Sequence, residues 1–186
     1  MGCSTIDRGS SADCANLPAG GTNARVIVAN FADISDWVES TLDERITGFT
    51  QAAGTMAYEF TGFRNDVKKS EEVVNPGIGI NQFKHNAGWV IYERTQAQKN
   101  NIEKLARGKF ILFVENKGKD ADAWEVIGKD VGVEIVAGPI RNAHENGGFF
   151  VLNFSTAEGE FEGKLPQTLG TTYANALTLI TNLLAS

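Results

Sequence analysis

The sequence predicts a mainly antiparallel β-sandwich or barrel with one flanking α-helix near residues 95–107. Short apolar runs separated by turn residues follow one another from residue 109 to residue 163, a spacing typical of sandwiches and barrels. Residues 56–61 alternate between two faces, with Met56, Tyr58 and Phe60 on one of them, as in a half-buried strand. Glycine is frequent, with 20 of 186 residues against a usual share of roughly 7%, which suits a fold with many turns.

The first part of the chain is predicted to be an arm followed by strands. Residues 1–23 are rich in Gly, Ser, Asp and Asn, a composition that orders only when something packs on it. Residues 25–29 form a first strand, and residues 33–38 are ambiguous between a helical turn and a loop. One strand is expected within residues 46–63. A return strand is expected from residue 78 to about residue 92, with a bulge at residues 86–88.

The stretch between these two strands, residues 64–77, is predicted to be a long hairpin loop. Hairpin loops usually have about two to five residues, and much longer ones are uncommon unless they are functional. The loop carries both signs of charge and three valines, for which a merely solvated loop has little use. We expect it to order against another subunit, with a flexible surface excursion as the alternative. The predicted contact residues are Arg64, Asp66, Val67, Lys68, Lys69, Glu71, Glu72, Val73 and Val74.

The helix has a start signal, an apolar stripe and a stop signal. Thr95 and Gln98 have the spacing of a capping box. Ile102, Leu105 and Ala106 then make a narrow apolar stripe. Gly108 is expected to end the helix in the left-handed conformation. Such a helix covers one side of a sheet or one end of a barrel.

Further strands are predicted after the helix, at residues 109–115, 123–127, 131–137, 149–154 and 160–163. The sandwich domain therefore spans residues 24–166, and residues 167–186 form a C-terminal extension. This tail is apolar, and its composition leaves helix and strand both open. Because it lies beyond the apparent sheet, it is a second candidate for contact with a neighbour, through Leu177, Ile180 and Leu184.

The sequence offers no catalytic, metal or cofactor site. The two histidines, His85 and His144, lack the spacing of metal ligands, and the Asn-Gly turn at residues 146–147 explains the surroundings of His144. Asp120, Asp122 and Glu125 lack the pattern of a calcium loop. No phosphate-binding loop or local nucleophile motif is present. We therefore predict that the chain is not an enzyme.

Charge and cysteine placement bound the partners and the compartment. The net charge of −6 makes the chain a poor sequence-independent binder of DNA phosphate. Cys3 and Cys14 are close enough in sequence to bridge, but two free thiols are the preferred prediction. No secretory signal or membrane-spanning segment is apparent, so we expect synthesis in the cytosol and no membrane partner.

The three tryptophans raise an alternative function. Trp37, Trp89 and Trp124 would form a sugar-stacking platform if they were exposed together, as in a monomeric β-sandwich carbohydrate-binding module. They are scattered along the chain, and Trp89 stands in an apolar strand, so we expect them to pack in the core.

The layout of residues 46–166 resembles that of the tail-tube-like virion proteins of tailed bacteriophages, and it is particularly similar to structural proteins of crAss-like phages that infect Bacteroidetes. The resemblance rests on layout and short patterns. These are a two-cysteine arm, a hairpin with a long loop, a helix that ends at Gly108, an apolar strand over residues 110–114, a polar turn followed by residues 124–128, and a strand-rich close over residues 149–166. The apolar C-terminus beyond Gly170 departs from this pattern.

The resemblance implies a structural protein of the virion tail that assembles in the bacterial cytoplasm as a homo-hexamer around a channel. Sheets of neighbouring copies would join into one inner β-barrel, which leaves no exposed edges. The hairpin would reach an adjacent ring, and the two terminal arms would clamp neighbours. The partners would be other copies and other tail proteins, with genomic DNA passing through without specific binding. Tube, ring and joining protein all remain open as the role.

Overall fold

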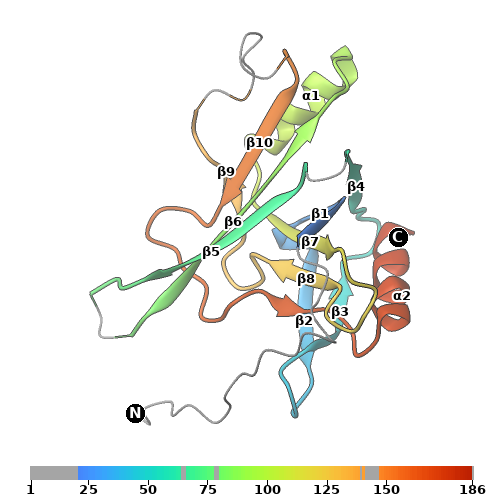
Figure 1. The fold of residues 1–186 in the computed structure, drawn as a ribbon, viewed down its shortest axis with the longest axis vertical. Helices are drawn as coiled ribbons and strands as arrows, with labels where there is room; N and C mark the ends of the chain where they lie inside the picture. The colour runs from blue at the N-terminus through green and yellow to red at the C-terminus, as the bar shows by residue number, and fades with distance from the viewer. Residues whose placement is uncertain (1–20, 64–65, 78–79, 139, 141–146, 186) are drawn as a thin grey trace.

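The computed structural model of the chain describes residues 21–63, 66–77, 80–138, 140 and 147–185. These residues form a mainly antiparallel β fold in which a five-stranded sheet lies between a four-stranded sheet and a C-terminal helix (Figure 1). The predicted mainly β sandwich-like class is therefore confirmed. Arg64, His144, Cys3 and Cys14 lie outside the described residues.

The five-stranded sheet is antiparallel, with the order β11-β8-β7-β1-β4. Its central strand β7 is buried on both faces, which explains its unbroken apolar run. Phe110, Leu112 and Val114 enter the core on one side, and Ile111 and Phe113 enter the core on the other. The strands are β1 (Thr22–Asn30), β4 (Tyr58–Thr61), β7 (Phe110–Asn116), β8 (Trp124–Ile127) and β11 (Gln167–Thr168).

The four-stranded sheet packs on one side of this layer, with the order β5-β6-β10-β9. Inside this core the Trp89 ring stacks on Phe154, with ring centroids 4.7 Å apart. Helix α1 (Gln96–Leu105) contributes Ile102 and Leu105 to the same core. The strands are β5 (Lys68–Val74), β6 (Gln82–Ile91), β9 (Glu134–Ile135) and β10 (Phe150–Ser155).

Helix α2 (Tyr173–Leu184) and a two-stranded sheet cover the other side. The small sheet pairs β2 (Ile34–Glu39) with β3 (Ile46–Gln51), and a short 3-10 helix (Phe31–Asp33) precedes it. Residues 33–38, which were ambiguous in the sequence, are therefore mostly strand. Figure 1 shows α2 alongside the sheet, on the side away from β5 and β6.

Helix α1 confirms the predicted N-terminal cap, because the Thr95 hydroxyl accepts a hydrogen bond from the Gln98 backbone N–H at 3.2 Å. The predicted left-handed end at Gly108 is wrong, because Gly108 has no positive φ. Space explains this glycine instead. A Cβ at residue 108 would lie 2.3 Å from Cζ of Phe110.

Several predicted strands are divided or shortened. Residues 46–63 form β3 and β4, which belong to different sheets because a turn at residues 52–57 separates them. Strand β6 runs without a bulge through residues 86–88, in continuous register with both of its neighbours. Residues 160–163 make only an isolated bridge, between Phe83 and Glu162.

Two predicted boundaries are also wrong. The loop at residues 64–77 contains the seven-residue strand β5, which pairs with β6 from Lys68 opposite Gly88 to Val74 opposite Gln82. The C-terminal segment, described over residues 167–185, is part of the main fold rather than an appended extension. It supplies β11, the fully buried Leu169, and the core-facing side of α2.

Candidate interaction surface

Among the strands that lie at a sheet edge in the described residues, β5 is the longest, with seven residues. Within the described residues β5 pairs only with β6, so its other edge has no strand beside it. Phe83 exchanges both backbone hydrogen bonds with Glu162, and the His85 carbonyl accepts from the Thr156 N–H. The backbone N–H and C=O groups of these two β6 residues therefore point away from β5. Backbone direction alternates along an antiparallel strand. It follows that the backbone N–H and C=O groups of Ser70, which stands opposite Asn86, point toward β6.

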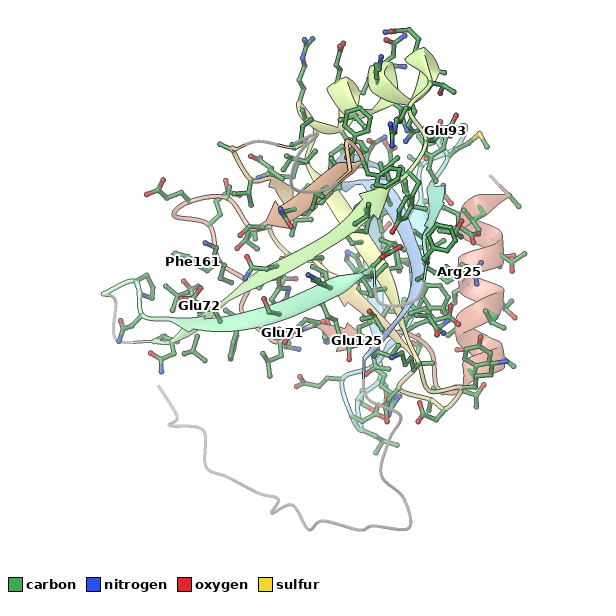
Figure 2. All side chains as sticks on the ribbon, turned by 45° about the horizontal axis from the view of Figure 1, so that its top comes forward. Arg25, Glu71, Glu72, Glu93, Glu125 and Phe161 are labelled. Carbon is green, nitrogen blue, oxygen red and sulfur yellow. The ribbon has the colours of Figure 1, made fainter. Side chains whose placement is uncertain are left out.

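The same alternation fixes which groups of β5 face outward. Lys69, Glu71 and Val73 stand opposite the β6 residues that point away from β5, so their own N–H and C=O groups lie on the open edge. An open edge of this length is a template for another strand. Figure 1 shows the β5–β6 hairpin extending from the body, and Figure 2 shows Glu71 and Glu72 on it, far from α2.

The predicted contact residues of this segment divide into two groups. Asp66 and Val67 act within the chain: the Asp66 carboxylate accepts from the Tyr92 hydroxyl at 2.7 Å, and Val67 is buried in the core. Lys69 is half-buried and pairs with Glu125. Burial lowers the pKa of Lys69, and the negative charge of Glu71 partly offsets this. The remaining described residues are available at the surface, with Val74 partly covered: Lys68, Glu71, Glu72, Val73 and Val74.

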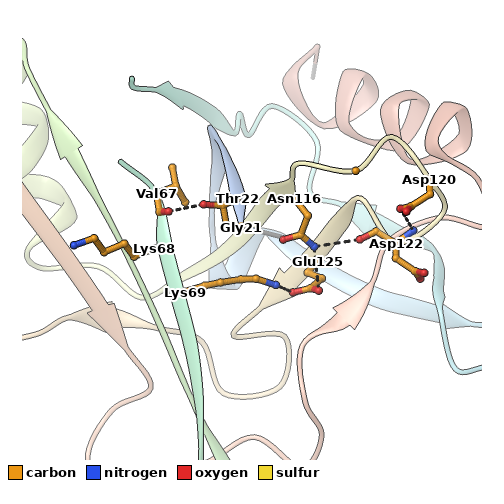
Figure 3. Close-up of a pocket in the computed structure, with 10 residues that line it drawn as sticks. Gly21, Thr22, Val67, Lys68, Lys69, Asn116, Asp120, Asp122 and Glu125 are labelled. Atoms are coloured by element: carbon orange, nitrogen blue, oxygen red, sulfur yellow. Dashed lines mark hydrogen bonds and ion pairs between the residues drawn. The ribbon is translucent and has the colours of Figure 1, made fainter. Parts of the chain in front are cut away.

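A polar groove lies beside the start of β5 (Figure 3). Its volume is about 700 Å³, and it separates β5 from the β7–β8 turn. The Thr22 hydroxyl donates to the Val67 carbonyl at one end, and the Asn116 amide donates to the Glu125 carboxylate and the Asp122 carbonyl at 3.1 Å each. Lys69 reaches across the groove to the Glu125 carboxylate, whereas the Lys68 side chain points away from the groove (Figure 3).

The face of the four-stranded sheet that turns away from the core carries mostly polar and charged side chains. Inward residues of β6 and β10, such as Trp89 and Leu152, are buried, while the alternate positions are more exposed or carry polar side chains. Gly88 lies on this outward face directly beneath Asn153, because a Cβ at residue 88 would lie 2.6 Å from the Asn153 Oδ1 atom. The charged and polar residues of the face include Lys68, Ser70, Glu72, Lys84, Asn86, Asn153 and Glu134.

The predicted C-terminal contact residues lie on α2. Ile180 is 1% exposed and packs in the chain's own core, so it cannot serve a neighbour and its predicted contact role is wrong. Leu177 and Leu184 are half-buried against the same core. The apolar character of the tail is thus explained largely by packing within one chain.

Two buried titratable side chains, Glu162 and His85, each bind the β8–β9 turn, a feature that sequence reasoning missed. Glu162 is 2% exposed, and its carboxylate accepts the backbone N–H groups of Asp130 at 3.0 Å and Val131 at 3.1 Å. Burial raises the pKa of Glu162 to about 7, outweighing the two backbone donors, which favour the ionised form. No local pattern marks Glu162, because its partners lie about 31 residues away in sequence.

His85 is the second of these two side chains, and it is also buried. Its Nε2 atom lies 2.9 Å from the Lys164 carbonyl, which fits a donating N–H, and its Nδ1 atom accepts from the Gly128 N–H at 3.5 Å. Burial lowers the pKa of His85, consistent with a neutral ring. These contacts fix the turn to the sheet, and no nucleophile is among them.

Other candidate sites do not come together in the described part of the chain. No group of three or more His, Cys, Asp or Glu side chains there could hold a metal ion, and no helix there is long and apolar enough to cross a membrane. Trp89 and Trp124 are 3% and 0% exposed, and Trp37 packs on Phe49 and Phe113. The tryptophans therefore form no exposed sugar-stacking platform.

Comparisons with protein-family models, with curated proteins and with solved structures found no match to this chain.

Proposed function

We propose that this chain is a structural subunit of a bacteriophage tail, which assembles as a hexameric ring or tube around a channel for DNA. The observation that carries the proposal is the open seven-residue edge of β5 on a hairpin that extends from the body. Another strand completes such an edge, and sheets joined edge to edge can close into a barrel. The number six comes from the resemblance in layout to tail-tube-like virion proteins.

In this assembly the four-stranded sheet would form the inner barrel. Its two edges are β5 and the short β9, so β5 of one copy would pair beside β9 of the next. The outward face of this sheet would then line the channel. Lys68 and Lys84 on that face are balanced by Glu72 and Glu134, so the face offers no cationic surface to hold DNA phosphates.

One pair of variants tests the role of the edge. Glu71→Pro removes an outward backbone N–H, whereas the bonds from β5 to β6 are made by the alternate residues and remain. Glu71→Ala is the matched control, because it loses the same side chain and keeps the N–H group. Deleting residues 64–77 would be a poorer test, because it would also remove the buried Val67.

Negative-stain microscopy and mass photometry on the concentrated chain provide the measurement. We expect sixfold rings or tubes from the wild type and from Glu71→Ala, and a loss of these assemblies in Glu71→Pro. Urea unfolding of both variants checks that each still folds. Rings from Glu71→Pro equal to those of Glu71→Ala would contradict the role of the edge, and a wild type that forms no ring would contradict the proposed function.

A further inference from the structure

The charges on β5 are arranged so that the strand complements a reversed copy of itself. The strand carries Lys68 and Lys69 on one side of Ser70, and Glu71 and Glu72 on the other. When two such strands run antiparallel with Ser70 opposite Ser70, every lysine of one faces a glutamate of the other. Opposite charges directly across a sheet stabilise the pairing, and like charges oppose it.

The backbone of the open edge fits this same register. With Ser70 on a two-fold axis, Lys69 of one strand stands opposite Glu71 of the other, and both residues have outward N–H and C=O groups. They can therefore exchange both backbone hydrogen bonds, as a hydrogen-bonded antiparallel pair does. The backbone N–H and C=O groups of Ser70 point toward its own β6. The two serines therefore form the close, non-hydrogen-bonded pair, which suits small side chains. A shift by one residue would place each residue with outward backbone groups opposite a residue whose groups point toward its own β6, and it would also lose the full charge match.

The surroundings of β5 leave room for this partner. An open groove lies beside the start of β5, and the Lys68 side chain points away from it, toward the outward face of the sheet. In the two-fold register, Glu72 of the second copy would stand next to Lys68 on this outward face. The Val67 carbonyl is already bound by the Thr22 hydroxyl, so the new ladder would begin at Lys69.

We infer that two copies of the chain pair through their β5 edges, antiparallel about a two-fold axis at Ser70, when they are not in a ring. The contact is isologous, so it closes on itself as a dimer. It occupies the edge that a ring would need, and it keeps that edge from pairing with unrelated strands. The inference stands on β5 alone and does not depend on the proposed tail function.

Two single charge reversals test the register. Lys68→Glu places glutamate opposite Glu72 at both symmetric positions, and Glu72→Lys places lysine opposite Lys68 at both. Both side chains are exposed, and neither forms an ion pair with another described residue. The variants also leave Lys69 and Glu125 unchanged, so that ion pair stays intact. Lys104→Glu on α1 is the control, because it reverses an exposed charge on another element.

Sedimentation velocity and mass photometry at low ionic strength give the readout, and urea unfolding confirms the fold of each variant. We expect the wild type and Lys104→Glu to dimerise. The dimer dissociation constant of each β5 variant alone should rise at least about tenfold, because the repulsive pair occurs twice in the symmetric dimer. An equal mixture of the two β5 variants should restore dimers that contain one copy of each. Added salt should weaken the wild-type dimer.

The outcomes separate this inference from the proposed function. A mixture that dimerises no better than its components overturns the two-fold register, and so does a wild type that remains monomeric at every concentration measured. Rings without such dimers would leave the tail proposal standing and refute the dimer. Dimers that never progress to rings would support the dimer and count against the tail proposal.

Discussion

Replacing Glu162 with glutamine should remove a marked pH dependence from the stability of this protein. The Glu162 carboxyl is buried, and its pKa is raised to about 7 from an ordinary value of 4.5. Between these two values the folded chain holds a proton on this carboxyl that the unfolded chain does not hold. Stability therefore falls as pH rises through this range, by the linkage between proton binding and folding. The contribution is fully present below about pH 4.5 and is lost as pH rises through about pH 7.

The size of the effect follows from the shift. A difference of one pKa unit corresponds to about 1.4 kcal/mol, so the shift of Glu162 amounts to about 3 kcal/mol of unfolding free energy. This is a large part of the stability of an ordinary domain, about 5–15 kcal/mol. The glutamine side chain of the Glu162→Gln variant cannot ionise, and its carbonyl oxygen can still accept from the β8–β9 turn. The difference between wild type and variant should thus grow toward neutral pH.

Other titratable groups near the turn must be separated from Glu162. The lowered pKa of the buried His85 makes stability rise with pH up to the ordinary histidine range, which opposes Glu162. The pKa of Glu39, held near 2 by hydrogen bonds from Lys129 and Lys164, acts at lower pH. Asp130 raises the pKa of Glu162 further through its negative charge. All of these groups remain in the variant, so the comparison with wild type isolates residue 162.

Urea unfolding from pH 4.5 to pH 8, at a concentration where the chain is monomeric, gives the required free energies. Wild type should lose up to about 3 kcal/mol across this range relative to Glu162→Gln. Glu160→Gln is the control, because Glu160 is exposed and pairs with Lys109 at the surface. It should keep the wild-type slope. Parallel curves for wild type and Glu162→Gln would refute the reasoning.

Two further predictions concern local packing and capping. Gly108→Ala should destabilise the chain by about 1–3 kcal/mol in urea, because its Cβ would meet the Phe110 ring at 2.3 Å; Gly48→Ala, whose Cβ has only ordinary contacts, should change little, and equal effects would contradict the packing argument. Thr95→Ala should cost about 1 kcal/mol through loss of the bond from the Gln98 N–H. Thr95→Ser should retain most of that stability, and a Ser variant as weak as Ala would argue against the cap.

Local signals predicted the elements whose causes are local. The Thr95 cap and the apolar stripe of α1 lie within a few residues of each other, and the run at residues 110–114 is apolar because β7 is covered on both faces. Strand β5 escaped prediction for the opposite reason. Most of its side chains are exposed, so its sequence lacks the alternation that marks a half-buried strand.

Contacts between distant residues explain what the sequence did not reveal at the candidate site. The role of Glu162 is visible only in the folded chain, where its carboxylate accepts from the β8–β9 turn. The same holds for His85, whose ring contacts Gly128 and Lys164. The tail was ambiguous because an apolar segment suits a strand or a helix equally well. Its core-facing positions, including Ile180, were assigned to a neighbour because the sequence does not show that the chain's own sheet has a second face to cover.

The proposed ring and the inferred dimer use the same backbone edge of β5 but depend on different side chains, so mutations can separate them. Any strand added to β5 needs its outward N–H groups, so Glu71→Pro should weaken both assemblies. The dimer alone requires Lys68 opposite Glu72, because only a reversed copy of β5 brings these two residues together. In a ring the edge would meet β9, whose charged residue is Glu134. In these two proposals, edge geometry would govern whether the chain associates, and the charges on β5 would favour the reversed copy over β9.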